Sequence, residues 1–473
     1  MRPRPSCCRA RAAAIADVTS RAGAVLRFVT IVAVLHAPSW FGGWLFQVPR
    51  AEERPLFNLD LLAAAALACT SSVWGMVALL LAWAADGFRA AAKNYHFMST
   101  LDLVDAARFV DMLNLQAFVS LQVVGAAVGL VAGLAATLWL TRQSRQFVLP
   151  LLLTAVLAAA CDVANGSFHL FGLDKDRRGI SLNYAGSPAL NVWSTELQSR
   201  AASVTVGAIP DPITFRTLRD WQTGHPSRTS LLVLVESMGL PRQPEVKHWL
   251  RARLMTTRLA SRWDASETEE LFHGSTTFGE LRTLCGLYAH YSQLDDVLAA
   301  GCLPHRLAAD GVDSVGIHGF GLRMFDRGLW WPRIGLQPWR WRGEKDLAMN
   351  CNPAFPGICD EEVIAEAVRQ AQTPGRFVYA LTLDTHLPMD KKRLAPVPSD
   401  LRVICDATGT PLEACQLVQE LGELLAYLEE KLIRSESTPL VVVVGDHGPP
   451  FSETANREVF EADRVPLFVL RPR

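Results

Sequence analysis

Four long apolar segments precede a polar half in this chain, and they constrain its fold more than any other feature. They span about residues 28–48, 59–85, 115–140 and 147–165. A helix needs roughly 20 apolar residues to cross a bilayer. A cleaved signal peptide accounts for only one such stretch. We therefore predict an α-helical transmembrane bundle of about four spans over residues 1–165.

Basic residues bear on the orientation of these spans. The loop at 141–145 carries Arg142 and Arg145, and the positive-inside rule assigns it to the cytoplasm. The last span then delivers the polar half to the outer side. The N-terminal arginines also favour the cytoplasm; these are Arg2, Arg4, Arg9 and Arg11. Four spans place both ends of the segment on the same side, so they cannot put the N-terminus in the cytoplasm and the polar half outside. A misassigned start codon, a hidden fifth span and an overridden N-terminus remain open explanations.

The cysteines of the polar half favour an oxidising compartment. Six of the ten cysteines lie there, and they fall into neighbouring pairs: Cys285 with Cys302, Cys351 with Cys359, and Cys405 with Cys415. An even number of closely spaced cysteines beyond membrane spans is typical of disulfides. Six free buried thiols are the alternative.

The polar half is predicted to be a linker at 166–229 followed by an α/β domain at 230–473. The strand-like runs are 231–236, 314–319, 377–384, 441–446 and 466–471. The helical stretches between them are about 244–260, 278–290, 361–373 and 412–433. Short apolar runs separated by helices indicate a sheet covered on both faces. A net charge of −1 and the absence of zinc-finger spacing give no support for nucleic-acid binding.

Several of these runs end in acidic or imidazole side chains. These are Glu236, His318, Asp384 with Thr385 and His386, and Asp446 with His447. The carboxyl edge of a parallel sheet is where ligands bind. Carboxylate and imidazole groups that meet there suit a divalent metal such as Zn²⁺ or Mn²⁺. For each residue alone, a helix cap or a structural histidine is the competing interpretation.

A Gly–Ser–Thr–Thr cluster at 274–277 opens a predicted helix. Hydroxyl residues dominate helix N-caps, which is the structural interpretation. A threonine next to a metal can instead lose its proton and attack a phosphorus or sulfur ester. Beside Glu236 and Asp446–His447, the nucleophile is the favoured interpretation.

The motifs VESMG, GSTTFGELR, HGFGLRMFDR, THLP and GDHGPPF, in this order, resemble the sulfatase/alkaline-phosphatase superfamily. The resemblance covers about 230–473 and is greatest to the membrane-anchored transferases of phosphoethanolamine and phosphoglycerol, such as lipoteichoic acid synthase. It implies an α/β/α sulfatase-like (alkaline phosphatase-like) domain. The Cys351–Cys359 separation also resembles a disulfide of the phosphoethanolamine enzymes.

The resemblance implies roles for individual residues. Glu236, Asp446 and His447 would hold the metal, and Thr276 would be the fourth ligand and the phosphorylated nucleophile. The spacing of the phosphoethanolamine enzymes would select Thr277 instead. The substrate-binding residues implied by position are His318, Arg327 and His386.

Two further motifs compete with or add to this interpretation. Cys302-Leu-Pro-His-Arg306 fits the C-x-P-x-R site at which sulfatases form formylglycine, although Cys302 is also needed to pair with Cys285. The run 330–341 holds four of the 13 tryptophans. Core packing is expected for two of them, and an interfacial anchor or a sugar platform for the rest.

Together these patterns predict a multi-pass protein of the bacterial inner membrane with a periplasmic catalytic domain. The reaction that the resemblance implies transfers a phosphoethanolamine or phosphoglycerol group from a phospholipid to a periplasmic glycan or lipid, through phosphothreonine and a Zn²⁺ or Mn²⁺ ion. A hydrolase of the same superfamily, a phosphatase or sulfatase, is the alternative. A degenerate, non-catalytic binding domain is a third possibility, disfavoured because all four proposed ligands are present.

Overall fold

The structure is a computed structural model that describes residues 7–45, 55–94, 105–118, 121–142, 144–164, 185–191, 193, 206–209, 212–225, 227–340, 351–389, 395–451 and 453–473. The chain forms two compact units. The first unit comprises Met1–Lys93 and Ser120–Leu197, and the second comprises Asn94–Val119 and Gln198–Arg473. The described residues 105–118, which precede the predicted linker in the sequence, belong to the second unit.

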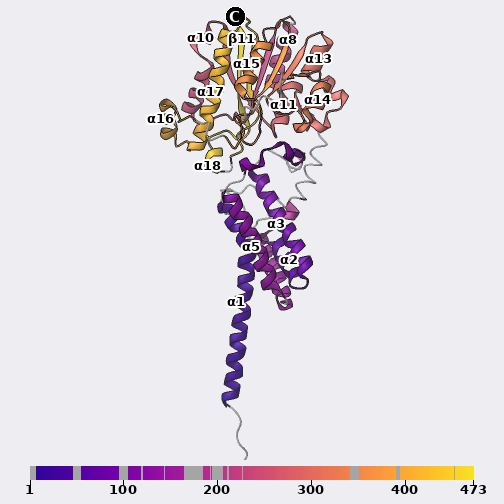
Figure 1. Ribbon diagram of the computed structural model, residues 1–473, viewed down its shortest axis with the longest axis vertical. Helices are drawn as coiled ribbons and strands as arrows, with labels where there is room; N and C mark the ends of the chain where they lie inside the picture. The colour runs from indigo at the N-terminus through magenta and orange to yellow at the C-terminus, as the bar shows by residue number, and fades with distance from the viewer. Residues whose placement is uncertain are drawn as a thin grey trace, which may run out of the picture. The chain divides into compact units, whose positions relative to one another are not determined.

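The first unit is helical (Figure 1). Its elements are α1 (Cys7–Leu45), β1 (Phe57–Asn58), α2 (Leu59–Ala68), α3 (Ser72–Asn94), α5 (Leu121–Thr141), η4 (Arg145–Phe147), α6 (Val148–Ala164) and β2 (Ala185–Gly186). Helix α1 packs against α5, and α2 packs against α6. Among the residues that the structure describes, two stretches, Arg21–Trp40 and Arg145–Ala164, are long and apolar enough to cross a bilayer.

The predicted span at 59–85 is wrong as a single helix, because the chain breaks between α2 and α3. Thr70 donates its hydroxyl to the carbonyl of Leu67 at 2.8 Å, and the hydroxyl of Ser71 accepts the backbone N–H of Trp74 at 3.5 Å. Such local side-chain bonds compete with the helical backbone pattern. The predicted span at 115–140 likewise begins too early, because α5 starts at Leu121.

The second unit is an α/β domain whose elements follow one another along the chain. Before the sheet come η2 (Ala107–Met112), η3 (Leu115–Phe118), β3 (Gly207–Ala208) and α8 (Ile213–Gly224). Its first half continues with β4 (Ser230–Val235), α9 (Pro244–Leu254), α10 (Thr257–Ala260), β5 (Trp263–Leu271), α11 (Thr276–Cys285), β6 (Leu287–Tyr288), η6 (Tyr291–Gln293), α12 (Asp296–Ala300) and α13 (Leu303–Ala309). The remainder is β7 (Ser314–His318), η7 (Met324–Asp326), α14 (Arg327–Arg333), β8 (Gln337–Pro338), α15 (Asp360–Gln370), β9 (Phe377–Leu381), α16 (Ser399–Thr408), α17 (Leu412–Arg434), β10 (Leu440–Gly445), α18 (Thr454–Arg457) and β11 (Arg464–Pro472).

A seven-stranded sheet in the order β5-β11-β10-β4-β9-β7-β8 forms the centre of the second unit. The five strands from β10 to β8 are parallel, while β11 and β5 run antiparallel at one edge. Strand β4 therefore lies between β10 and β9, with Val235 opposite Gly445. This arrangement brings the carboxyl ends of β4, β10, β9 and β7 to one edge.

Successive residues of the buried strands pack into opposite cores, as the two-residue period of a strand requires. In β4, Leu231 and Val233 join the core beneath α9, α15, α16 and α17. Leu232 and Leu234 join the core beneath α8, α11, α13 and α14. The predicted α/β/α arrangement of this domain is therefore confirmed (Figure 1).

The element boundaries differ from the prediction in places with a clear local cause. The helix expected at 244–260 is divided because Thr256 caps α10 through the backbone N–H of Leu259. The helix expected at 278–290 ends at Cys285, since Gly286 adopts a left-handed conformation with φ of 66°. The structure contains the three predicted disulfides, Cys285–Cys302, Cys351–Cys359 and Cys405–Cys415.

Candidate functional site

The site begins where two neighbouring parallel strands end. Glu236 follows β4 and Asp446 follows β10, and these strands are hydrogen-bonded to each other. Both carboxylates are buried, with 2% and 0% of their surface exposed. Oδ1 of Asp446 accepts the backbone N–H of Ser237 at 2.8 Å and that of His447 at 2.6 Å. The strand ends therefore hold two carboxylates side by side.

One oxygen of this pair has no hydrogen-bond donor. Oδ2 of Asp446 is buried without a hydrogen bond among the described residues, and it lies 3.2 Å from Nε2 of His447. A buried carboxylate oxygen without a donor is costly unless a cation compensates it. Burial, with Glu236 adding to it, raises the pKa of Asp446 to about 7.

His447 places its Nε2 beside the carboxylates of Glu236 and Asp446. Its Nδ1 bonds the carbonyl oxygen of Gly448 at 2.8 Å, which assigns the proton to Nδ1 in the neutral ring. Nε2 then carries the lone pair that a metal ligand needs, and it lies 3.6 Å from Oε1 of Glu236. A backbone carbonyl that fixes the tautomer in this way is the usual partner of a metal-binding histidine.

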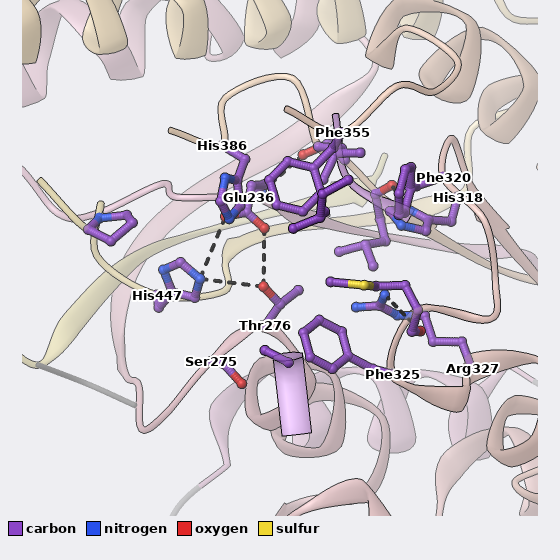
Figure 2. Close-up of a pocket in the computed structure, with 17 residues that line it drawn as sticks. Glu236, Ser275, Thr276, His318, Phe320, Phe325, Arg327, Phe355, His386 and His447 are labelled. Atoms are coloured by element: carbon purple, nitrogen blue, oxygen red, sulfur yellow. Dashed lines mark hydrogen bonds and ion pairs between the residues drawn. The ribbon is translucent and has the colours of Figure 1, made fainter. Parts of the chain in front are cut away.

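Thr276 completes the cluster from the first residue of α11 (Figure 2). Its hydroxyl donates to Oε2 of Glu236 at 3.1 Å and lies 3.4 Å from Nε2 of His447. Thr277 is buried, and its hydroxyl lies 3.2 Å from that of Ser275. Of the two threonines left open by the motifs, the structure brings Thr276 to the carboxylates.

The donor set fits a divalent metal. The donor atoms of Glu236, Asp446 and His447 lie within 4.8 Å of one another. Four separations within the cluster, including Thr276, are 3.1, 3.2, 3.4 and 3.6 Å. Ligand bonds of about 2.0 to 2.1 Å in a tetrahedron would separate donor atoms by about 3.3 to 3.4 Å. Two carboxylates, one imidazole and one hydroxyl suit Zn²⁺ or Mn²⁺.

Two residues that the sequence did not single out hold this cluster in place. The guanidinium of Arg282 donates to the carbonyl oxygens of Gly445 at 2.6 Å and Asp446 at 3.1 Å, so it fixes the end of β10. Gly279 allows α11 to approach closely, because a Cβ there would lie 3.1 Å from the Cβ of Asp446. Both residues lie on α11, within the motif that carries Thr276, but their partners at the end of β10 cannot be read from the sequence.

The three predicted substrate-binding residues line a cavity of about 200 Å³ together with Thr276, Glu236 and His447 (Figure 2). Nδ1 of His318 bonds the carbonyl oxygen of Leu381 at 3.0 Å, and Nδ1 of His386 bonds that of Leu387 at 2.6 Å. Burial lowers the pKa of His318 to about 3, with Arg327 adding to the effect. Burial also lowers the pKa of His386 to about 4, and His447 contributes. Both rings are neutral at physiological pH.

Arg327 is held by the buried carboxylate of Glu280, which lies on α11. Its Nε donates to Oε2 of Glu280 at 2.9 Å, and Nη1 donates to the carbonyl oxygen of Met324 at 3.5 Å. Within the described part of the chain, Nη2 of Arg327 makes no hydrogen bond. Glu280 also accepts Trp331 at 3.0 Å and Tyr379 at 3.2 Å. Burial raises the pKa of Glu280, and Arg327 opposes this rise.

Other residues that the sequence singled out have structural roles. Asp384 is turned to the start of α15, where Oδ2 accepts the backbone N–H of Asp360 at 2.8 Å. Thr385 donates to the carbonyl oxygen of Glu236 at 2.5 Å and so supports the first carboxylate. Trp330 and Trp331 are buried in the core. Cys302 is in a disulfide with Cys285, so the formylglycine interpretation is wrong.

No protein-family model and no curated protein matches the chain. Among solved structures, it is similar to the lipoteichoic acid synthase LtaP from Listeria monocytogenes, with 14% identity, 58% of this chain and 71% of that chain covered, and a TM-score of 0.35. It is also similar to an alkaline phosphatase superfamily protein from Vibrio parahaemolyticus, with 14% identity, 52% and 62% coverage, and a TM-score of 0.38.

A third similar structure is the Streptococcus pyogenes phosphoglycerol transferase GacH in complex with sn-glycerol-1-phosphate. The identity is 14%, the coverage is 56% of this chain and 77% of that chain, and the TM-score is 0.36. Of these three, the Vibrio parahaemolyticus protein is named as a member of the alkaline phosphatase superfamily. The chemistry below depends on the geometry of the site.

Proposed function

We propose that the chain is a metal-dependent phosphotransferase that moves a phosphoethanolamine or phosphoglycerol group from a phospholipid to a periplasmic glycan or lipid. The observation that carries the proposal is the position of the Thr276 hydroxyl. It lies 3.1 Å from Glu236 and 3.4 Å from His447, at one end of a cavity that His318, His386 and Arg327 also line. A nucleophile, a metal-binding set and phosphate-binding side chains thus share one cavity.

In the proposed first step, Oγ1 of Thr276 forms a bond to phosphorus, and the bond from phosphorus to the glycerol oxygen of the lipid breaks. Diacylglycerol leaves with the proton that Thr276 gives up. Nη2 of Arg327 and the side chains of His318 and His386 would contact the phosphoryl oxygens. A metal bound by Glu236, Asp446, His447 and Thr276 would lower the pKa of the hydroxyl and offset the negative charge.

In the second step, an acceptor hydroxyl forms a bond to phosphorus while the bond to Oγ1 of Thr276 breaks. The proton of the acceptor hydroxyl restores the threonine. Water in place of the acceptor would make the chain a hydrolase. The two outcomes share the phosphothreonine intermediate and differ only in the second step.

A location in the bacterial inner membrane, with the catalytic domain in the periplasm, forms part of the proposal. Three disulfides in the second unit support an oxidising compartment. The helices of the first unit expose large apolar side chains, such as Leu26, Leu81 and Val156, which are 69%, 66% and 64% exposed. Exposed apolar surface on this scale is typical of contact with lipid.

The proposal is tested by mass spectrometry of the full-length protein after incubation with phosphatidylethanolamine or phosphatidylglycerol and Zn²⁺ or Mn²⁺. We expect a phosphoethanolamine or phosphoglycerol adduct on the tryptic peptide Trp263–Arg282, located at Thr276. Thr276→Ala should abolish the adduct, whereas the matched variant Thr277→Ala should retain it. An unmodified Thr276 under all these conditions, together with full activity of Thr276→Ala, would sink the covalent mechanism.

A further inference from the structure

Residues 105–118, which lie between α3 and α5 in the sequence, belong to the second unit and contact the catalytic cavity. We call them the α3–α5 segment. They form η2 and η3, and η2 packs against η7. The segment is separated by about two hundred residues from the side chains it contacts, so its position depends on tertiary contacts.

Polar contacts hold the first half of the α3–α5 segment. The hydroxyl of Tyr291 donates to Asp105. Arg108 bridges Asp105 at 2.7 Å and Asp326 at 3.1 Å. Burial raises the pKa of Tyr291, and the hydrogen bond to Asp105 raises it further. The segment is therefore fastened both to η6 and to η7.

The second half of the segment is held by the backbone and by an apolar contact. The backbone N–H of Asn114 donates to Ala354 at 2.9 Å, and its side-chain amide donates to Pro353 at 3.0 Å. Phe109 is buried, and its ring meets that of Phe325 edge-on with 5.6 Å between centroids. The segment thus packs as part of the domain's smaller apolar core.

These contacts fall on a strained turn. Phe325 and Asp326 both have left-handed backbone conformations, with φ of 53° and 52°. For residues with a Cβ this conformation is strained, so surrounding contacts must maintain it. Phe109 and Arg108 supply two such contacts, and the next residue after the turn is Arg327.

The cavity has a polar end and an apolar wall. Thr276, Glu236 and His447 lie at the polar end, and Ala106 and Leu113 of the α3–α5 segment contribute to the apolar lining. The other apolar lining residues include Phe320, Met324, Phe325, Phe355 and Leu383. A ligand that fits both parts carries an anionic group next to an apolar one.

We propose that the α3–α5 segment holds the apolar part of the donor, the glycerol-linked start of the acyl chains of a phospholipid. This inference depends on the proposed function, which puts the donor phosphorus at Oγ1 of Thr276. The ethanolamine or glycerol headgroup is polar, so the apolar wall suits the diacylglycerol side of the phosphodiester. A cavity of about 200 Å³ accommodates this junction, while the remainder of the chains extends beyond it.

The first test compares donors with and without acyl chains in the full-length protein. Leu113→Asn should lower kcat/KM for the diacyl phospholipid about tenfold, equivalent to about 1.4 kcal/mol. The same variant should change kcat/KM for the deacylated donor, the matching glycerophosphodiester, less than twofold. Leu115→Asn is the matched control, because Leu115 lies in the same segment, is 53% exposed and does not line the cavity.

Equal losses on both donors, or none on either, would overturn the inference. If Leu113→Asn instead lowered kcat/KM only with a lipid acceptor that carries acyl chains, the assignment of the segment to the donor would be overturned. Photocrosslinking gives a readout that does not need turnover. A phospholipid with a diazirine near the start of its acyl chain should label residues 109–118, and Leu113→Asn should reduce the labelling.

Labels confined to α5 and α6 would contradict the inference even in an active protein. Conversely, labelling of residues 109–118 in a chain that turns over neither donor would support the binding site and refute the proposed function. The two failures are therefore distinguishable.

Discussion

Glu280 accepts a hydrogen bond of 2.9 Å from Nε of Arg327, and both side chains are buried in the second unit. The pair links the helix that begins with Thr276 to the residue proposed to bind the phosphoryl oxygens. A buried ion pair is not by itself stabilising, but removing one partner leaves an uncompensated charge. The first prediction follows from this asymmetry.

Glu280→Gln keeps the size of the side chain and removes its charge. We expect a loss of about 3 kcal/mol, or roughly 6 to 12 °C in Tm, because Arg327 would stay buried without its counter-charge. Thermal unfolding of the full-length protein measures the shift. Glu366→Gln on α15 is the control, since its partner Arg369 is 59% exposed. Equal shifts for the two variants would contradict the prediction.

Arg282→Lys should weaken metal binding without unfolding the protein. A lysine cannot reproduce the fork by which Arg282 binds the carbonyl oxygens of Gly445 and Asp446. Loss of such an outer contact costs about 10 to 100-fold in metal affinity. Competition with a chromophoric Zn²⁺ chelator measures the affinity. Arg219→Lys, at an exposed pair with Asp220, should bind Zn²⁺ as tightly as the wild type.

Asp446→Asn should raise the Tm of the metal-free protein and abolish the stabilisation that added metal gives. Oδ1 of the new amide can still accept the backbone N–H groups of Ser237 and His447. The amide nitrogen would donate to Nε2 of His447, which lies 3.2 Å from the present Oδ2. The amide also removes a buried charge beside Glu236. Thermal unfolding with EDTA and then with Zn²⁺ or Mn²⁺ separates the effects. Asp296→Asn is the control, because the Asp296 side chain is 95% exposed. It should change neither the Tm in EDTA nor the stabilisation by added metal.

His318 should make the metal-free protein less stable as the pH falls. Its pKa is lowered to about 3 in the folded protein, against about 6.5 when unfolded, so the unfolded chain binds the proton first. The contribution of neutral His318 to the free energy of unfolding is present above pH 6.5, and it falls by about 2 kcal/mol between pH 6.5 and 5. His318→Asn keeps an N–H donor for the carbonyl oxygen of Leu381 and removes the contribution of this histidine to the dependence of stability on pH. Unfolding in EDTA at several pH values measures it, and an unchanged slope would argue against the shift.

The buried strands and the meeting of Glu236 with Asp446 and His447 were predictable from the sequence. Val441 to Val444 form an apolar run that stops at Gly445, and such runs identify a strand covered on both faces. The parallel pairing of β4 with β10 then brings Glu236 to Asp446. These residues carry their signal locally, in residue type and in their position at a strand end.

Residues that act through distant contacts gave no such signal. The edge strand β5 reads as polar, with Glu267, Glu269 and Glu270, because most of its side chains are partly or fully exposed. Arg282 and Glu280 look like ordinary charged helix residues until their partners are known. Asp384 shows the reverse error, since its position at a strand end resembled a ligand while its carboxylate caps α15.

The α3–α5 segment also affects the order in which the protein can fold. Asp105 is synthesised 186 residues before Tyr291, and Asn114 is synthesised 239 residues before Pro353. Contacts between such distant residues form late, because the loop between them must close first. The cavity wall can therefore be completed only after most of the catalytic domain has left the ribosome. Until then, Phe109 and Leu113 need another apolar environment.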